Sequence, residues 1–156
     1  MPKRSSAKKT VSKKSVSKKS STSKAKPAKK SPINHFEIPF DNLERTKKFY
    51  GSIFGWDFID MPEMDYTMVF TTEVDQNQAA TTPGAVNGGL TKKNPLQTTP
   101  TLVVTVESVD AISKQIEASG GQLLGEKIPV GDMGLYQLFK DPEGNVLGIF
   151  QSIQRM

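Results

Sequence analysis

Hydrophobic and polar residues follow regular patterns beyond residue 32, and these patterns predict alternating strands and helices. The alternation in INHFEIPF predicts a strand over residues 33–40. Apolar residues then recur at helical spacing over residues 43–54, with Asp41 or Asn42 as the N-cap and Gly55 as the stop. Three further strands are predicted over 56–61, 65–72 and 85–90, with a polar loop over 73–83.

The second half of the chain repeats this order. The first strand of each half starts at Ile33 and at Thr101, 68 residues apart, and the helices start at Leu43 and Val109, 66 residues apart. A strand, a helix and three strands thus occur twice, which predicts two βαβββ modules over about 33–90 and 99–153. The elements predicted in the second module are a strand over 99–108, a helix over 109–119 and strands over 122–130, 135–141 and 145–153.

Basic and acidic residues are unevenly distributed between the N-terminal segment and the rest of the chain. Residues 1–32, which we call the Lys-rich tail, hold 12 of the 21 basic residues and none of the 16 acidic ones. The remainder, residues 33–156, therefore carries a net charge of −7. The tail offers only two Val as branched apolar residues, too few to offset the entropy of ordering, so we expect it to be disordered.

The composition excludes several classes of protein. The chain has no Cys, which rules out disulfides, iron–sulfur clusters, thiol nucleophiles and Cys-based zinc sites. It has no apolar stretch long enough to span a bilayer and no secretory signal pattern, so we expect a cytoplasmic protein without a membrane partner. A single His limits any metal site to one imidazole and oxygen ligands.

Several motifs resemble the vicinal oxygen chelate superfamily, which includes glyoxalases, extradiol dioxygenases and bleomycin-resistance proteins. They are INHFEIPF, the helix LERTKKFYGSIFGW, Gly88-Gly89 and the closing DPEGNVLGIF. The resemblance covers residues 33–156 and implies an α+β fold, in which two βαβββ modules form an eight-stranded open sheet curled around a cleft.

Strand alternation predicts which side chains face that cleft. Phe36 and Ile38 suit the side covered by the first helix, which leaves Ile33, His35 and Glu37 on the cleft side. In the second module, Leu102, Val104 and Val106 are expected under the helix, and Thr101, Val103 and Thr105 in the cleft.

Metal-dependent members hold one divalent ion with His, Glu or Gln side chains from four strands. By resemblance, the first ligand position is His35, and the others fall within Gly88–Leu90, at Thr101 and at Gly148. Such a set lacks the three or four good donors that Zn²⁺, Fe²⁺ or Ni²⁺ requires, so we expect no cofactor. A divalent metal completed by other oxygen ligands is the alternative.

The candidate site residues admit two interpretations each. We select His35, Glu37, Trp56, Tyr66, Met68 and Thr101 for ligand binding and Glu37 as a catalytic base. The alternatives are a structural role for His35, a solvated carboxylate for Glu37, and core packing for the aromatic and Met side chains.

Three functions follow from these features. We expect a metal-free domain that binds a small molecule in the cleft; the alternative is a divergent lyase, isomerase or dioxygenase-type enzyme, with or without a metal.

The tail is expected to contact nucleic acid nonspecifically, which would place the protein at a nucleoid or nucleus; a solubilising tail is the alternative. A homodimer is also compatible with the sequence. The expected nucleic-acid contacts are Lys8, Lys9, Lys13, Lys14, Lys18, Lys19, Lys29 and Lys30.

Overall fold

The computed structural model describes residues 29–153, which contain eight strands and two α-helices. The predicted structure and contacts of residues 1–28 lie outside this range. The first half contains β1 (Ile33–Phe40), α1 (Leu43–Phe54), β2 (Asp57–Met61), the short 3₁₀ helix η1 (Pro62–Met64), β3 (Tyr66–Phe70) and β4 (Asn87–Lys92). The second half contains β5 (Thr101–Thr105), α2 (Val109–Ala118), β6 (Gln122–Val130), β7 (Gly134–Lys140) and β8 (Val146–Ser152).

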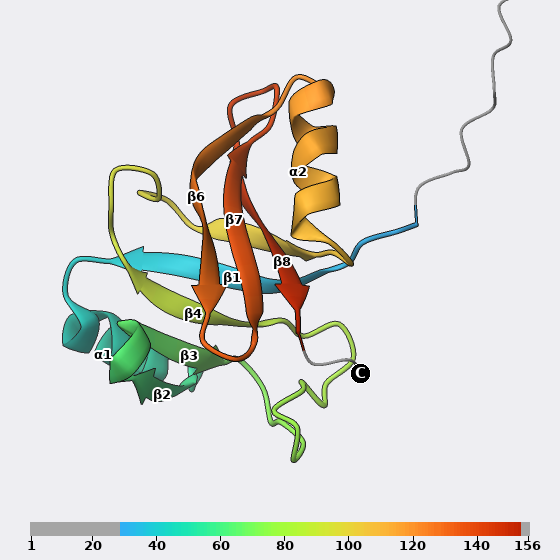
Figure 1. Cartoon of the computed structure of the whole chain (residues 1–156). Coiled ribbons are helices and arrows are strands. Elements are labelled where there is room, and N and C mark those ends of the chain that lie inside the picture. The colour runs from blue at the N-terminus through green and yellow to red at the C-terminus, as the bar shows by residue number, and fades with distance from the viewer. Residues whose placement is uncertain (1–28, 154–156) are drawn as a thin grey trace, which may run out of the picture.

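All eight strands belong to one open, curled sheet in the order β2-β3-β4-β1-β5-β8-β7-β6 (Figure 1). Each half repeats the same pairing, because β1 is parallel to β4 and β5 is parallel to β8, while the other neighbours within each half are antiparallel. Antiparallel pairing of β1 with β5 joins the halves. The predicted α+β class and eight-stranded sheet are therefore confirmed.

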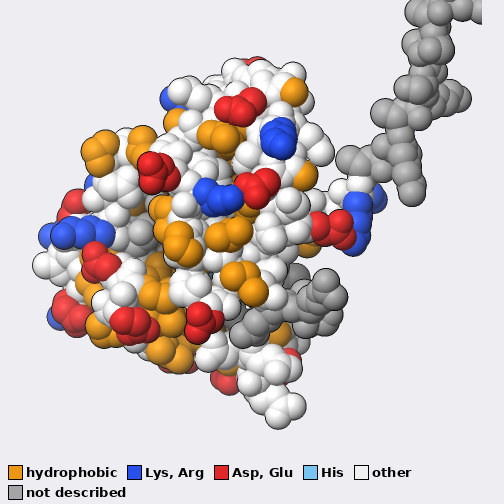
Figure 2. Space-filling model, in the orientation of Figure 1, with side chains coloured by type: hydrophobic (Ala, Val, Ile, Leu, Met, Phe, Trp, Pro, Cys, Tyr) orange, Lys and Arg blue, Asp and Glu red, His pale blue; other side chains and the backbone are white. Residues whose placement is uncertain are grey.

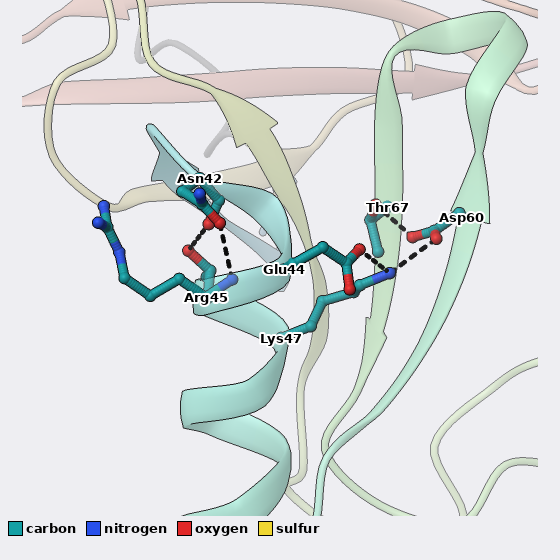
Figure 3. A network of polar contacts seen from close by, with 7 residues as sticks. Asn42, Glu44, Arg45, Lys47, Asp60 and Thr67 are labelled. Carbon is teal, nitrogen blue, oxygen red and sulfur yellow. Dashed lines mark hydrogen bonds and ion pairs between the residues drawn. The ribbon is translucent and has the colours of Figure 1, made fainter.

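Local signals explain where α1 begins and ends. Asn42 is the N-cap, and its Oδ1 accepts a hydrogen bond of 2.8 Å from the Arg45 backbone N–H. Gly55 ends the helix with a φ of 68°, a left-handed conformation that glycine adopts without strain. Lys47 of α1 forms an ion pair with the sheet, since its Nζ lies 2.8 Å from Asp60 of β2 (Figure 3).

The two faces of the sheet bury different side chains. On one face, Val109 of α2 packs in a cluster with Val106 and Ile149. The opposite face buries Val103 with Tyr136 and Leu138. We call this second face, which also carries Glu37 and His35, the inner face.

Apolar side chains on the helix side of the sheet are less covered than a periodic pattern suggests. On α1, Phe49, Ile53 and Phe54 are each more than half exposed. Leu102, expected under the second helix, is 50% exposed. Both results have one cause: a periodic pattern marks which side chains share a face, but it does not give the area that a neighbouring element covers.

Candidate functional site on the inner face

Glu37 lies at the junction of the two modules. It belongs to β1, the strand that pairs with both halves, and its neighbours in register are Gly89 of β4 and Thr101 of β5. Its Oε2 accepts hydrogen bonds from Gln97 Nε2 at 2.6 Å and from the Tyr136 hydroxyl at 3.0 Å. Residues from β1, β7 and the loop before β5 thus converge on one carboxylate oxygen.

Burial dominates the electrostatics of Glu37. Loss of water around the carboxylate raises the pKa of Glu37, and the hydrogen bonds from Gln97 and Tyr136 offset this only in part. The pKa of the Tyr136 hydroxyl is raised as well, by its own burial first and then by the charge of Glu37. Tyr136 therefore remains a protonated donor at neutral pH.

His35 forms a second polar pair two residues before Glu37 and on the same face of β1. Its Nε2 lies 2.7 Å from the hydroxyl of Tyr66, which comes from β3. Burial lowers the pKa of His35 to about 4, so the imidazole is neutral at pH 7. Burial also raises the pKa of Tyr66, followed by the charge of Glu37, so this phenol stays protonated too.

We call His35, Glu37, Tyr66, Gln97 and Tyr136 the Glu37 cluster. Among the described residues, no buried side-chain nitrogen or oxygen lacks a hydrogen-bond partner. Glu37 Oε1, His35 Nδ1 and Gln97 Oε1 form no hydrogen bond with the residues described, so none of these three atoms is fully buried. They are the side-chain polar atoms of the cluster without a partner in the described part of the chain.

Two tyrosines cover two glycines on this face, once in each module. A Cβ added at Gly89 would lie 1.8 Å from the Tyr66 hydroxyl oxygen, and a Cβ added at Gly148 would lie 2.6 Å from that of Tyr136. Both tyrosines come from the strand beside the glycine. The space that a longer side chain would need at these positions is therefore filled by a ring.

This packing decides which metal ligands the face can offer. Gly89 and Gly148 lie at expected ligand positions and supply no donor atom, and the Thr101 hydroxyl is turned toward the Thr99 backbone oxygen at 3.4 Å. Within residues 29–153, no group of three or more His, Asp or Glu side chains is arranged to hold a metal. The donors that remain are His35, Glu37, the Gln97 amide oxygen and two protonated phenols. His35 Nε2 and Glu37 Oε2 are already hydrogen-bonded and only the carboxylate is charged, so this set does not fit a tight divalent site.

The other predicted ligand-binding residues are placed differently. Met68 alternates with Tyr66 on β3 and pairs in register with Gly89, which places it on the inner face. Trp56 lies elsewhere: its ring stacks on Tyr50 of α1 at 5.0 Å and contacts Phe36 at 5.9 Å, on the helix side of the sheet. The structure therefore does not bring Trp56 to the Glu37 cluster.

Two of the predicted nucleic-acid contacts fall within the described residues. Lys29 forms an ion pair with Glu107, and both side chains are about 80% exposed. Lys30 is exposed. The other six predicted lysines precede residue 29 and lie outside the described part of the chain.

The sequence interpretation missed two members of the cluster. Gln97 is only 4% exposed although it lies in a polar loop, where its backbone N–H bonds the Asn94 side chain at 3.1 Å. Tyr136 is 99 residues from Glu37 in the chain. A usable signal was present for Tyr136, because it alternates with Leu138 on a strand whose period places both on one face.

Comparison with known proteins identifies the family. The model of the Glyoxalase/Bleomycin resistance protein/Dioxygenase superfamily matches residues 32–149. The chain belongs to this superfamily. Its predicted resemblance to the vicinal oxygen chelate group is thereby confirmed.

Individual members of the superfamily are distant from this chain. It is 30% identical over 112 residues to the putative glyoxylase CFP32 of Mycobacterium tuberculosis, a match that covers 69% of this chain and 40% of that protein. It is 26% identical over 126 residues to a probable lactoylglutathione lyase of Vibrio parahaemolyticus, covering 78% of this chain and 91% of the relative. The match thus spans about two fifths of the length of the mycobacterial relative.

Solved structures agree on the fold. The hypothetical protein BH1468 of Bacillus halodurans superposes with a TM-score of 0.57 at 13% identity, covering 82% of this chain and 99% of that one. Methylmalonyl-CoA epimerase of Mycobacterium tuberculosis superposes with a TM-score of 0.52 at 12% identity, covering 78% and 88%. At these identities the likeness concerns the fold alone.

Proposed function

We propose that this glyoxalase-like domain binds a small organic molecule on its inner face, over the Glu37 cluster, without a resident metal. The observation that carries this proposal is the covering of Gly89 and Gly148 by tyrosine rings, because it replaces two expected ligand positions with phenol hydroxyls. The face keeps a polar centre but loses the donor set of a metal enzyme.

The cluster offers a defined chemistry to such a ligand. Glu37 Oε1 accepts a hydrogen bond from an N–H or O–H group, while Gln97 and Tyr136 hold the other carboxylate oxygen in place. His35 Nδ1 supplies a neutral contact two residues away on the same strand. A ligand with a hydrogen-bond donor beside an apolar body suits these groups and the neighbouring Met68 side chain.

A ligand screen by thermal shift tests the binding proposal, with Glu37→Gln as the probe variant. A ligand of the cluster should raise the melting temperature of the natural protein by several degrees at saturating concentration. It should raise that of Glu37→Gln much less, because an amide oxygen is a weaker acceptor than a carboxylate. Glu126→Gln, which changes an exposed carboxylate of β6, is the matched control and should respond like the natural protein.

The same assay tests the metal-free state. Protein treated with a chelator should melt at the temperature of untreated protein, because an ion that binds only the folded state would stabilise it. Stoichiometric Zn²⁺, Fe²⁺, Ni²⁺ or Mn²⁺ in purified protein, with a large melting shift on its removal, would reject this part of the proposal. Ligand binding by the metal-loaded protein alone would reject the whole.

Proton transfer is a second candidate function, and the raised pKa of Glu37 favours it. A buried carboxylate with an increased proton affinity is a suitable general base. The relatives include a protein called lactoylglutathione lyase, so we propose a lyase or isomerase reaction as the alternative. Any ligand found in the screen should then exchange a C–H proton with D₂O in the presence of the protein and not with Glu37→Gln.

We propose further that the Lys-rich tail contacts nucleic acid or another polyanion through charge. Twelve basic residues without one acidic residue support this role. Such contacts would hold a cytoplasmic protein at the nucleoid or, in a nucleated cell, at chromatin. No helix in the described part of the chain is long and apolar enough to cross a membrane.

A further inference from the structure

A cavity of about 260 Å³ lies at the outer edge of the sheet in the first module. It is lined by residues of β2, of β3 and of the loop that follows: Asp57, Ile59, Phe70, Thr72, Glu73, Val74 and Gln78. Asp57 pairs with Phe70 in the strand register and Ile59 pairs with Met68, so the floor of this edge cavity belongs to the inner face. The cavity is separate from the Glu37 cluster and shares no residue with it.

The lining combines apolar surface with two carboxylates. Phe70 is 6% exposed, while Ile59 is 49% exposed and presents an open apolar side chain. Asp57 and Glu73 are exposed, and neither forms an ion pair with another residue in the range 29–153. A cavity lined by two residues with unpaired carboxylates, by an aromatic residue and by aliphatic residues suits a cation with an apolar body.

Other acidic residues near the edge cavity make the local electrostatic potential more negative. Residues 57–91 contain six acidic residues and no Lys, Arg or His. Lys47, which contacts β2, forms ion pairs with Asp60 and Glu44 on the helix side of that strand. Figure 2 shows several acidic side chains over the part of the molecule where Figure 1 places β2 and β3. A concave site within such a region concentrates cations.

The loop that lines one side of the cavity is held by contacts within the loop itself. Val74 and Ala80 form an antiparallel bridge, and Asp75 Oδ1 accepts hydrogen bonds from the backbone N–H groups of Asn77 at 2.8 Å and Ala79 at 3.0 Å. The Asp75 carboxylate is thus already hydrogen-bonded within the turn, whereas Glu73, which lines the cavity, remains available to a ligand. We propose that the edge cavity is a binding site for organic amines, whose ammonium group lies between Asp57 and Glu73 and whose apolar part contacts Ile59 and Phe70.

Three probes of one shape and different charge test this site. Phenethylamine, 2-phenylethanol and phenylacetate are titrated into the full-length protein while ¹⁵N–¹H NMR shifts are followed. We expect saturable shifts at Asp57, Phe70 and Glu73, with phenethylamine bound about tenfold more tightly than the alcohol and phenylacetate bound weakest. At about 1 M salt the preference should shrink to within about twofold, since exposed charges are then screened. Equal affinities, or no saturable shifts at these residues, would overturn the proposal.

Variants separate this site from the cluster. Asp57→Asn combined with Glu73→Gln should reduce the affinity for phenethylamine to that for the alcohol. Glu63→Gln, which changes a carboxylate in the same acidic segment outside the lining, should reduce it far less. Glu37→Gln should not alter amine binding here. Shifts confined to His35 and Glu37 would instead assign the amine to the cluster, which would reject the edge cavity and support the proposed function.

Discussion

Tyr136 donates a hydrogen bond of 3.0 Å to Glu37, and this contact joins the two modules on the inner face. The donor comes from β7 and the acceptor from β1, strands that are separated in the sheet by β5 and β8. The ring of Tyr136 crosses this distance over Gly148, where a side chain would displace it. The small residue on β8 and the polar contact on β1 are therefore parts of one arrangement.

Replacing Tyr136 with Phe removes one of two donors to the Glu37 carboxylate. Because a hydrogen bond to the charged form lowers the pKa, its loss should raise the pKa of Glu37 further. The free energy of unfolding at pH 7 should fall by about 1 to 2 kcal/mol. A ¹³C NMR titration of the Glu37 carboxyl measures the first effect, and denaturant unfolding measures the second.

Tyr66→Phe is the matched control, because Tyr66 bonds His35 and makes no hydrogen bond to Glu37. It should leave the pKa of Glu37 nearly unchanged.

The folded state binds the Glu37 proton more tightly than the unfolded state, so this group reduces stability as pH rises from the ordinary Glu range through its raised pKa. Tyr136→Phe should make this loss of stability with rising pH larger. An unchanged titration of Glu37 in the variant would contradict the hydrogen bond between Tyr136 and Glu37.

His35 makes an opposite contribution to the pH dependence of stability. Its pKa is about 4 in the folded protein and about 6.5 when unfolded, so the unfolded state binds more protons between these values. The free energy of unfolding should therefore fall as pH decreases from 6.5 to 4, by on the order of 2 to 3 kcal/mol from this group. The chain has no other His, so His35→Gln should remove this component entirely. Parallel stability curves for the two proteins across pH 4 to 7 would show that His35 is not buried as described.

Gly89→Ala should be destabilising because its Cβ would fall 1.8 Å from the Tyr66 hydroxyl oxygen. Tyr66 must then move away from His35, with an expected loss of about 1 to 3 kcal/mol. Combining Gly89→Ala with Tyr66→Ala removes the clash, so the double variant should lose less than the sum of the two single losses. Additive losses in denaturant unfolding would show that the ring and the glycine are independent.

Local patterns predicted most of the fold because they report on neighbouring residues. The ranges 33–40 and 43–54 coincide with β1 and α1, and 122–130 coincides with β6. Their signals are short-range: strand alternation, an Asn N-cap and a stop glycine. The duplicated order then gave the number of strands in the sheet.

The same patterns predicted the site only in part. His35 and Glu37 were found because both lie on the inner face of one strand. Gln97 was missed because its burial depends on a loop folding over β1. Trp56 lies apart from the cluster because it stacks on Tyr50, a contact that depends on the position of α1. Contacts of this kind depend on tertiary packing, and the periodicity of a sequence carries no information about it.

Deleting residues 1–31 should leave the melting temperature within a few degrees of the full-length value. Among the described residues, the deletion removes the Lys29–Glu107 ion pair, which is highly exposed and so contributes little. It spares Pro32, whose carbonyl accepts a hydrogen bond of 2.9 Å from Thr105. For a domain of this size, a few degrees corresponds to about 1 kcal/mol. Loss of cooperative unfolding in the truncated protein would place the domain boundary before residue 32.

The tail itself should bind duplex DNA through charge and without sequence preference. Its lysines recur in pairs at 8–9, 13–14 and 18–19, and residues 1–32 contain no aromatic side chain that could stack on bases. If about six lysines contact phosphates together, the logarithm of the binding constant should fall with the logarithm of salt concentration with a slope of roughly −5. Gel shifts over a salt series with sequence-unrelated duplexes measure both the slope and the lack of preference.

Charge on the domain should oppose this binding. Residues 33–156 carry a net charge of −7, so the isolated tail peptide should bind DNA at least as tightly as the full-length protein, and the tail-deleted domain should not bind. Changing the eight predicted contact lysines to Gln tests whether charge is the cause, since it keeps the length and polarity of the tail but leaves four of its 12 basic residues. Retention of DNA by the tail-deleted domain, or an undiminished affinity of the Lys→Gln variant, would reject the tail as the electrostatic anchor.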